Sequence, residues 1–204
     1  MNFPKVIIFI NSLIPLGLLL WDVYRGRVGP NPLEFATRTT GMLALIFLTV
    51  SLAVTPLRKI TGINSIVKFR RMLGLFAFFY AFLHLTTYIW FDRFFNLRST
   101  VSDIAQRPFI AIGMAAFFLM LPLAITSTSK MVKKLGGKRW ARLHRIVYVA
   151  AILAVFHFWL LVKSDTRLPL TFAFVLALLL GHRLLVKLYP PETHARHTTL
   201  FSRD

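Results

Sequence analysis

Two histidines, His84 and His157, lie inside separate apolar stretches of the sequence. Imidazole is a ligand for transition metals, and an ionisable side chain inside a membrane is costly and indicates a functional site. His84 follows Arg71 by 13 residues and His157 follows Arg145 by 12, which on helices are depths of about 20 and 18 Å. Both imidazoles are therefore predicted in one layer, as the axial pair of a haem.

An ordinary explanation also exists for each histidine taken alone. Its imidazole would hydrogen-bond a nearby hydroxyl such as that of Thr86, Thr87 or Tyr88, as polar side chains in membrane bundles do. That explanation gives no reason for two histidines at one depth, so the sequence favours ligation. Bulky apolar neighbours, among them Phe82 and Phe156, would suit a dry haem slot.

Six apolar spans must position these residues. They cover residues 6–21, 41–54, 72–91, 109–126, 146–162 and 168–186, and the second is the shortest. None shows the apolar and polar alternation of a membrane strand, so helices are expected. The predicted fold is an all-α integral membrane bundle of six helices, with one domain over 1–186 and a tail over 187–204.

The charges indicate how this bundle is oriented. The 204 residues include 25 Lys and Arg, 7 Asp and Glu, and no cysteine. Without cysteine, disulfides, thiolate haem ligation and iron–sulfur clusters are excluded. The basic residues lie in the connections between spans, which argues against a nucleic-acid-binding domain. Alternate sides hold 17 and 8 of them, so the positive-inside rule predicts cytoplasmic N and C termini.

His144 and two arginines are further candidates. His144 precedes His157 by 13 residues, about 20 Å along a helix, which is an offset suited to a second haem. On one straight helix, however, the two side chains would be about 140° apart in azimuth. Arg70 precedes His84 by 14 residues, and with Arg71 it is a candidate to contact a haem propionate.

The other three histidines are weaker candidates for metal ligands. His182 lies about one turn inside the end of the last span, as an alternative partner in the inner layer or as a lone polar group. His194 and His197 lie in the polar tail, where two ligands on a short flexible segment make a weak metal site. They are interpreted as solvated.

Two segments carry a family resemblance. The first reads RRMLGL from Arg70 and continues to YAFLH, which ends at His84. The second reads LGGKRW over 135–140 and leads to LHR at 143–145 and then to His157. These segments resemble the ferric-reductase-like transmembrane family, and within it the haem-binding membrane subunits of methionine sulfoxide reductase systems. The resemblance covers nearly the whole chain.

This resemblance implies a multi-pass protein of the bacterial inner membrane that binds one or two b-type haems and flavin mononucleotide (FMN). Electrons would come from the quinone pool or a cytosolic flavin reductase. They would go to a periplasmic molybdopterin-containing reductase, MsrP, which repairs methionine sulfoxide in proteins. The chain would then be an electron-transfer subunit, not an enzyme, with the catalytic site in its partner.

The same resemblance leaves two features open. Related NADPH oxidases have two histidine pairs on the corresponding spans, whereas here Arg70 stands where another histidine would lie. The number of haems is therefore open. No flavin motif is recognisable, so no FMN residue is assigned.

Two other functions remain as alternatives. A small transporter or metal permease would use the intramembrane histidines as substrate or proton sites, although the spans lack carboxylates and show no repeat. A scaffold subunit would use them only for packing. A coloured protein on purification would separate the haem interpretation from both.

Overall fold

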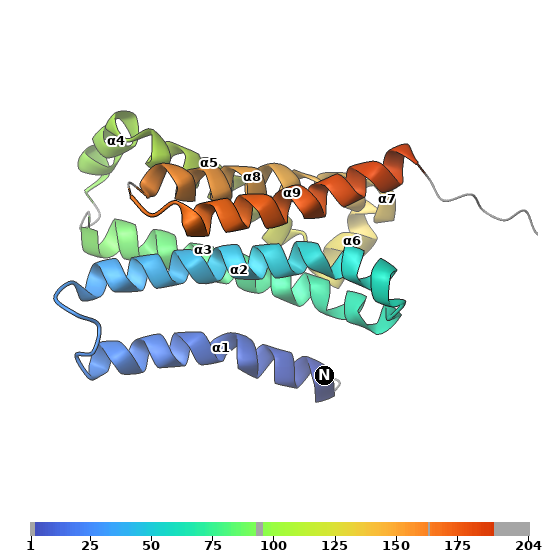
Figure 1. Cartoon of the computed structure of the whole chain (residues 1–204), viewed down its shortest axis with the longest axis horizontal. Coiled ribbons are helices and arrows are strands. Elements are labelled where there is room, and N and C mark those ends of the chain that lie inside the picture. The colour runs from blue at the N-terminus through green and yellow to red at the C-terminus, as the bar shows by residue number, and fades with distance from the viewer. Residues whose placement is uncertain (1–2, 93–95, 163, 190–204) are drawn as a thin grey trace, which may run out of the picture.

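Six long helices form the body of the protein and lie roughly side by side (Figure 1). The computed structural model describes residues 3–92, 96–162 and 164–189, which are almost wholly helical and contain no strand. In chain order the elements are α1 (Phe3–Tyr24), α2 (Pro32–Thr61), η1 (Asn64–Phe69), α3 (Arg70–Thr87), η2 (Tyr88–Asp92), α4 (Leu97–Gln106), α5 (Pro108–Ile125), α6 (Ser129–Leu135), α7 (Gly137–Leu143), α8 (Ile146–Leu161) and α9 (Arg167–Leu188). The prediction of an all-α bundle with six spans is confirmed.

The helices extend beyond the apolar spans that predicted them. Helix α2 has 30 residues, although only 41–54 read as a span. Hydropathy detects the segment suited to lipid, whereas the helix continues through polar turns at both ends. The connection over 127–145 contains α6 and α7, and the one before α5 contains α4. These short helices were not predicted, because they are too short or too polar to read as spans.

Local sequence explains where α2 begins and ends. Oδ1 of Asn31 accepts the N–H of Glu34 at 3.1 Å, which caps the helix, and Pro32 occupies its first position. Gly62 follows the last turn with φ of 72°, the left-handed conformation that glycine adopts most easily. Gly136, between α6 and α7, has φ of 75°. The helix therefore breaks at Gly136, and α7 begins at the next residue.

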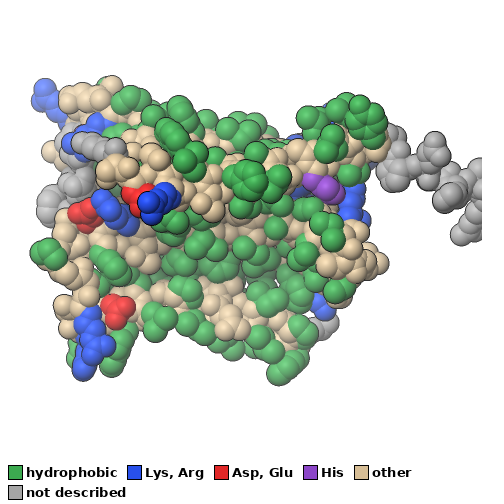
Figure 2. Space-filling view, viewed as in Figure 1, with side chains coloured by type: hydrophobic (Ala, Val, Ile, Leu, Met, Phe, Trp, Pro, Cys, Tyr) green, Lys and Arg blue, Asp and Glu red, His purple; other side chains and the backbone are tan. Residues whose placement is uncertain are grey.

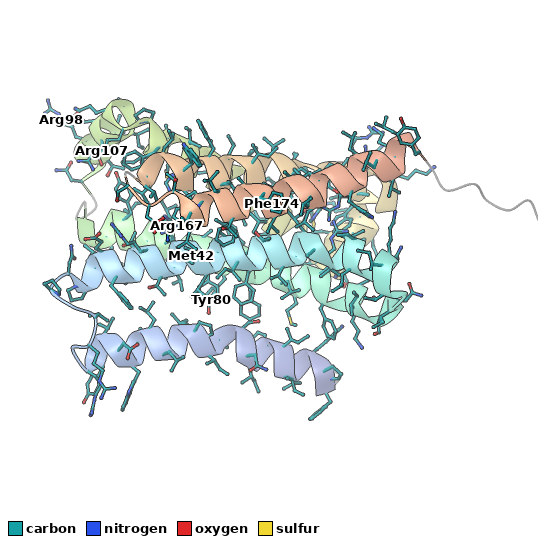
Figure 3. The ribbon with its side chains drawn as sticks, viewed as in Figure 1. Met42, Tyr80, Arg98, Arg107, Arg167 and Phe174 are labelled. Carbon is teal, nitrogen blue, oxygen red and sulfur yellow. The ribbon has the colours of Figure 1, made fainter. Side chains whose placement is uncertain are left out.

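The core lies where α2, α3, α5, α8 and α9 converge. Ala77, Ala150 and Ala151 are buried there, and such small side chains let membrane helices approach closely. The buried core residues are Leu45, Leu48, Leu52, Ala77, Met120, Ala150, Ala151, Val155 and Leu176. Helix α1 lies outside this core. It packs through the ring pair of Phe9 and Phe76 and through Tyr80 of α3, whose side chain lies on the side facing α1 (Figure 3).

The two ends of the bundle differ in charge. We call the end formed by the α2–η1 connection, α6 and α7 the basic end, and the opposite end the α4 end. Figure 2 shows red side chains only toward the α4 end of the visible face, with blue at both ends. The acidic residues in the described ranges all belong to segments at the α4 end: Asp22, Glu34, Asp92, Asp103 and Asp165. The basic end is therefore strongly cationic over the described residues.

Candidate functional site

The rings of His84 and His157 lie next to each other within the bundle, close to the last turns of α3 and α8. Their centroids are 6.1 Å apart and their planes make an angle of 77°. His84 lies on α3 and His157 on α8, 73 residues later in the chain. The prediction that both imidazoles share one layer is confirmed.

Each imidazole is fixed by a backbone carbonyl of a neighbouring helix. Nδ1 of His84 lies 2.8 Å from the carbonyl oxygen of Thr37 on α2, and Nδ1 of His157 lies 2.6 Å from that of Phe109 on α5. Because a carbonyl only accepts hydrogen bonds, each Nδ1 must carry the proton and donate it. The lone pair of each neutral ring is then on Nε2, as a metal ligand requires.

This spacing fits two imidazoles on one metal ion. Metal–nitrogen bonds of about 2 Å, added to the radii of two coaxial rings, put the centroids about 6 Å apart. Two ring planes that share the axis through the metal can take any angle about it. No cluster of three or more His, Cys, Asp or Glu suited to a metal occurs among the described residues. A macrocycle that supplies four equatorial nitrogens, as haem does, fits such a two-ligand site.

The hydroxyls near His84 have other partners. Thr86 donates to the carbonyl of Phe82, and Thr87 donates to the carbonyl of His84 itself, both at 2.8 Å. The Thr37 hydroxyl donates to Thr87 at 2.9 Å, which joins α2 to α3 beside the histidine. The hydrogen bond described for the His84 imidazole is therefore with a carbonyl of another helix and not with a local hydroxyl.

The expected aromatic lining needs a correction. Phe82 is 51% exposed and Phe156 is 48% exposed, so both point out of the bundle. Their spacing explains this, since one residue turns a helix by about 100° and neither shares a face with its histidine. In a membrane these two rings would contact lipid, not a haem slot.

Two glycines that the sequence analysis did not single out lie against the histidines. A Cβ on Gly41 of α2 would be 2.9 Å from Nδ1 and Cε1 of His84. A Cβ on Gly113 of α5 would be 2.8 Å from Nδ1 of His157. The two spacings are similar, since Gly41 precedes His84 by 43 residues and Gly113 precedes His157 by 44, but they single out these glycines only once the helix pairs are known.

His144 belongs to a separate pocket near the basic end. It follows α7, and its ring stacks on Trp140 with centroids 3.9 Å apart. Its Nε2 lies 3.2 Å from the hydroxyl of Thr126. The pocket has a volume of about 270 Å³ and is also lined by Arg70 and Arg71. His144 lies in a turn between α7 and α8, so the straight-helix estimate of its azimuth does not apply.

Arg70 and Arg71 lie far from the paired histidines. Fourteen helical residues separate Arg70 from His84, which is about 21 Å. Nη1 of Arg70 is 3.4 Å from the hydroxyl of Thr55, and Nη1 of Arg71 is 3.3 Å from that of Ser129. Any propionate that these arginines contact would therefore belong to a ligand of the pocket beside His144.

The remaining histidines do not join either group. His182 lies on α9, and its buried Nδ1 has no hydrogen-bond partner among the described residues. It does not line the pocket beside His144. His194 and His197 lie outside the described residues.

The fold and the paired imidazoles define a multi-pass integral membrane protein with a two-histidine site. The sequence model described as "Ferric reductase like transmembrane component" matches residues 40–155, which include His84 and end two residues before His157. Because that match covers more than half of the sequence, the chain belongs to the ferric-reductase-like transmembrane family.

Curated relatives narrow the family further. A protein of Herminiimonas arsenicoxydans is 50% identical over 178 residues, covering 86% of this chain and 82% of the relative. One of Rhodospirillum rubrum is 49% identical over 183 residues, covering 88% and 86%. One of Xanthomonas euvesicatoria is 43% identical over 201 residues, covering 96% and 92%. All three are named protein-methionine-sulfoxide reductase heme-binding subunit MsrQ.

Proposed function

We propose that this chain is the haem-binding electron-transfer subunit of a methionine sulfoxide reductase system, with His84 and His157 as the axial ligands of one haem b. The observation that carries the proposal is the meeting of two Nδ1-protonated imidazoles at a centroid distance of 6.1 Å. The names of the relatives give the class of cofactor and the system.

The residues of the chain have defined tasks in this proposal. His84 and His157 offer Nε2, and the carbonyls of Thr37 and Phe109 hold the ring orientations. Both histidines are partly shielded within the bundle, which keeps bulk water from the site. A haem held by His84 and His157 would supply one-electron transfer.

The charge distribution supports an orientation across the bacterial inner membrane. The basic end would face the cytoplasm with both termini, and the α4 end would face the periplasm. The donor would be the quinone pool or a cytosolic flavin reductase. The acceptor would be a periplasmic molybdopterin-containing reductase of MsrP type, which holds the catalytic site for methionine sulfoxide and so repairs oxidised proteins.

The pocket beside His144 is the place that we propose for a second haem. His144 would provide a ligand there once its contact with Thr126 is exchanged, and Arg70 and Arg71 would contact propionates. The residues lining the pocket include no second histidine. FMN follows from the family resemblance alone, and we assign it no residue.

Absorption spectra of the protein purified in detergent test this function. We would record oxidised and dithionite-reduced spectra, with pyridine haemochrome quantification, for wild type and for His84→Ala, His157→Ala and His144→Ala. His182→Ala is the matched control, because His182 is an intramembrane histidine outside both groups. Wild type and the control should show a low-spin b-type spectrum, and the first two variants should lose it.

The haem-to-protein ratio decides the role of His144. A ratio of two in wild type that falls to one in His144→Ala would support a second haem, whereas a ratio of one would end that part of the proposal. A folded wild type that is colourless and does not take up added haemin would overturn the proposed function. The transporter or scaffold alternatives would then be preferred.

A further inference from the structure

Gly41 and Gly113 occupy equivalent places against the two histidines. Each lies on the helix that supplies the carbonyl, α2 for His84 and α5 for His157. In both cases the accepting carbonyl is four residues before the glycine, at Thr37 and at Phe109. The same local arrangement therefore occurs twice, on two unrelated segments of sequence.

Helix geometry explains why glycine is needed at these positions. The side chain of a helical residue leans toward the N-terminus, over the preceding turn. That turn contains the carbonyl of the residue four positions earlier, which also accepts the N–H of the glycine itself in a regular helix. A side chain at Gly41 or Gly113 would occupy the space through which Nδ1 reaches this carbonyl. A Cβ at either position would lie 2.8 to 2.9 Å from ring atoms, which is too close for a Cβ unless the imidazole moves.

Other helical glycines lack such contacts. A Cβ on Gly17 of α1 or on Gly181 of α9 would have no atom within 4 Å. Glycine is less favourable than alanine in a helix interior, so a helix gains nothing from it without a packing or functional reason. At Gly41 and Gly113 the reason is the approach of an imidazole to the backbone.

We propose that Gly41 and Gly113 are positioning residues. They set how closely the rings of His84 and His157 approach the backbone carbonyls and which ring nitrogen carries the proton, and thereby tune the reduction potential of the haem. This inference rests on the proposed function, in which both histidines are ligands. A hydrogen bond from Nδ1 to a carbonyl makes Nε2 a stronger donor. A stronger donor favours the ferric over the ferrous ion, so a shorter hydrogen bond lowers the potential.

The surroundings of the two carbonyls differ at one position, and this difference lets the proposal predict the direction of a shift in reduction potential. The hydroxyl of Thr40 donates to the Ala36 carbonyl at 2.8 Å and also lies 3.1 Å from the Thr37 carbonyl, so it shares part of its hydrogen bond with the acceptor of His84. The corresponding residue three after Phe109 is Ile112, which has no hydroxyl. The hydrogen bond of His157 is also the shorter, at 2.6 Å against 2.8 Å.

The experiment compares Gly41→Ala and Gly113→Ala with the controls Gly17→Ala and Gly181→Ala in the full-length protein. Haemin titration gives the affinity, and a redox titration followed by absorption gives the midpoint potential. The controls should match wild type. Each test variant should bind haem about 10-fold or more weakly and show a more positive potential. Thr40→Val should shift the potential in the opposite direction, because the Thr37 carbonyl then serves His84 with less competition.

The outcomes separate this inference from the function on which it rests. A wild type that binds no haem would overturn both. A haem-binding wild type, with glycine variants that fold and keep its affinity and potential, would overturn the positioning role alone. Should a glycine variant not fold, Thr40→Val still decides, because an unchanged potential there would show that the carbonyl does not tune the ligand.

Discussion

The hydroxyl of Tyr88 donates a 2.9 Å hydrogen bond to Oδ2 of Asp103, and so ties the end of the helix that carries His84 to α4. Oδ1 of the same carboxylate lies 3.1 Å from Nε of Arg107. Asp103 is only 7% exposed, so its carboxylate is a buried acceptor for both Tyr88 and Arg107. Arg107 immediately precedes α5, the helix that contains Phe109 and Gly113. Asp103 therefore braces the ends of both helices near the histidines.

Asp103→Ala is expected to lower the free energy of unfolding by about 1–3 kcal/mol, because Tyr88 and Arg107 each lose a buried acceptor. Thermal unfolding in detergent, followed by intrinsic fluorescence, measures the effect. Asp165→Asn is the control, because the amide keeps an acceptor for the Arg167 N–H and removes only an ion pair that is long, at 4.0 Å, and largely exposed. The control should change stability by less than about 0.5 kcal/mol. Equal effects of the two substitutions would contradict a bracing role for Asp103.

Tyr80→Phe is expected to loosen α1 without changing the haem site. The Tyr80 side chain is fully buried, and its hydroxyl donates to the Ser12 carbonyl at 2.6 Å. Loss of that bond should cost about 0.5–1.5 kcal/mol and make α1 more sensitive to protease, while the haem content stays at the wild-type value. Tyr24→Phe, at a residue that is 81% exposed, should leave protection unchanged. Unaltered protease protection in Tyr80→Phe would show that packing alone holds α1.

The absence of cysteine makes the orientation directly testable. Lys134→Cys places one thiol at the basic end, and Arg167→Cys places one at the α4 end, both at exposed positions. A membrane-impermeant maleimide added to intact cells with a permeable outer membrane should label Arg167→Cys. Lys134→Cys should react only after the inner membrane is disrupted. The reverse pattern would invert the proposed topology, and with it the sides assigned to donor and acceptor.

The sequence predicted the number of spans and the shared layer of the histidines, because both depend on counting residues along helices. His84 and His157 stand 13 and 12 residues from charged positions, and helical rise converts such counts into depth. Counting residues along a helix gives the depth of a side chain but not the direction in which it points from the helix axis. Phe82 and Phe156 were therefore assigned to the site although they face outward. The ligand role of the two histidines remains a proposal.

The backbone partners of the histidines could not be predicted by the same means. A carbonyl acceptor has no sequence signature, since every residue has one. Gly41 and Gly113 are visible only as glycines in apolar spans, like Gly17 and Gly181, which face open space. Their distances from the histidines, 43 and 44 residues, gain meaning once the helices are known to pair. The fold supplies that information.

The pairing of α2 with α3 and of α5 with α8 also bears on assembly. Each pair contains a complete half of the site: one imidazole, the carbonyl that orients it, and the glycine that admits it. Neither half needs the other to form its ligand, because the hydrogen bonds of His84 and His157 stay within their own pairs. A metal held between the rings would then join the α2–α3 pair to the α5–α8 pair. Because α2, α3, α5 and α8 also share one apolar core, and Phe78 of α3 stacks on Phe117 of α5, haem loss would leave the two pairs packed together.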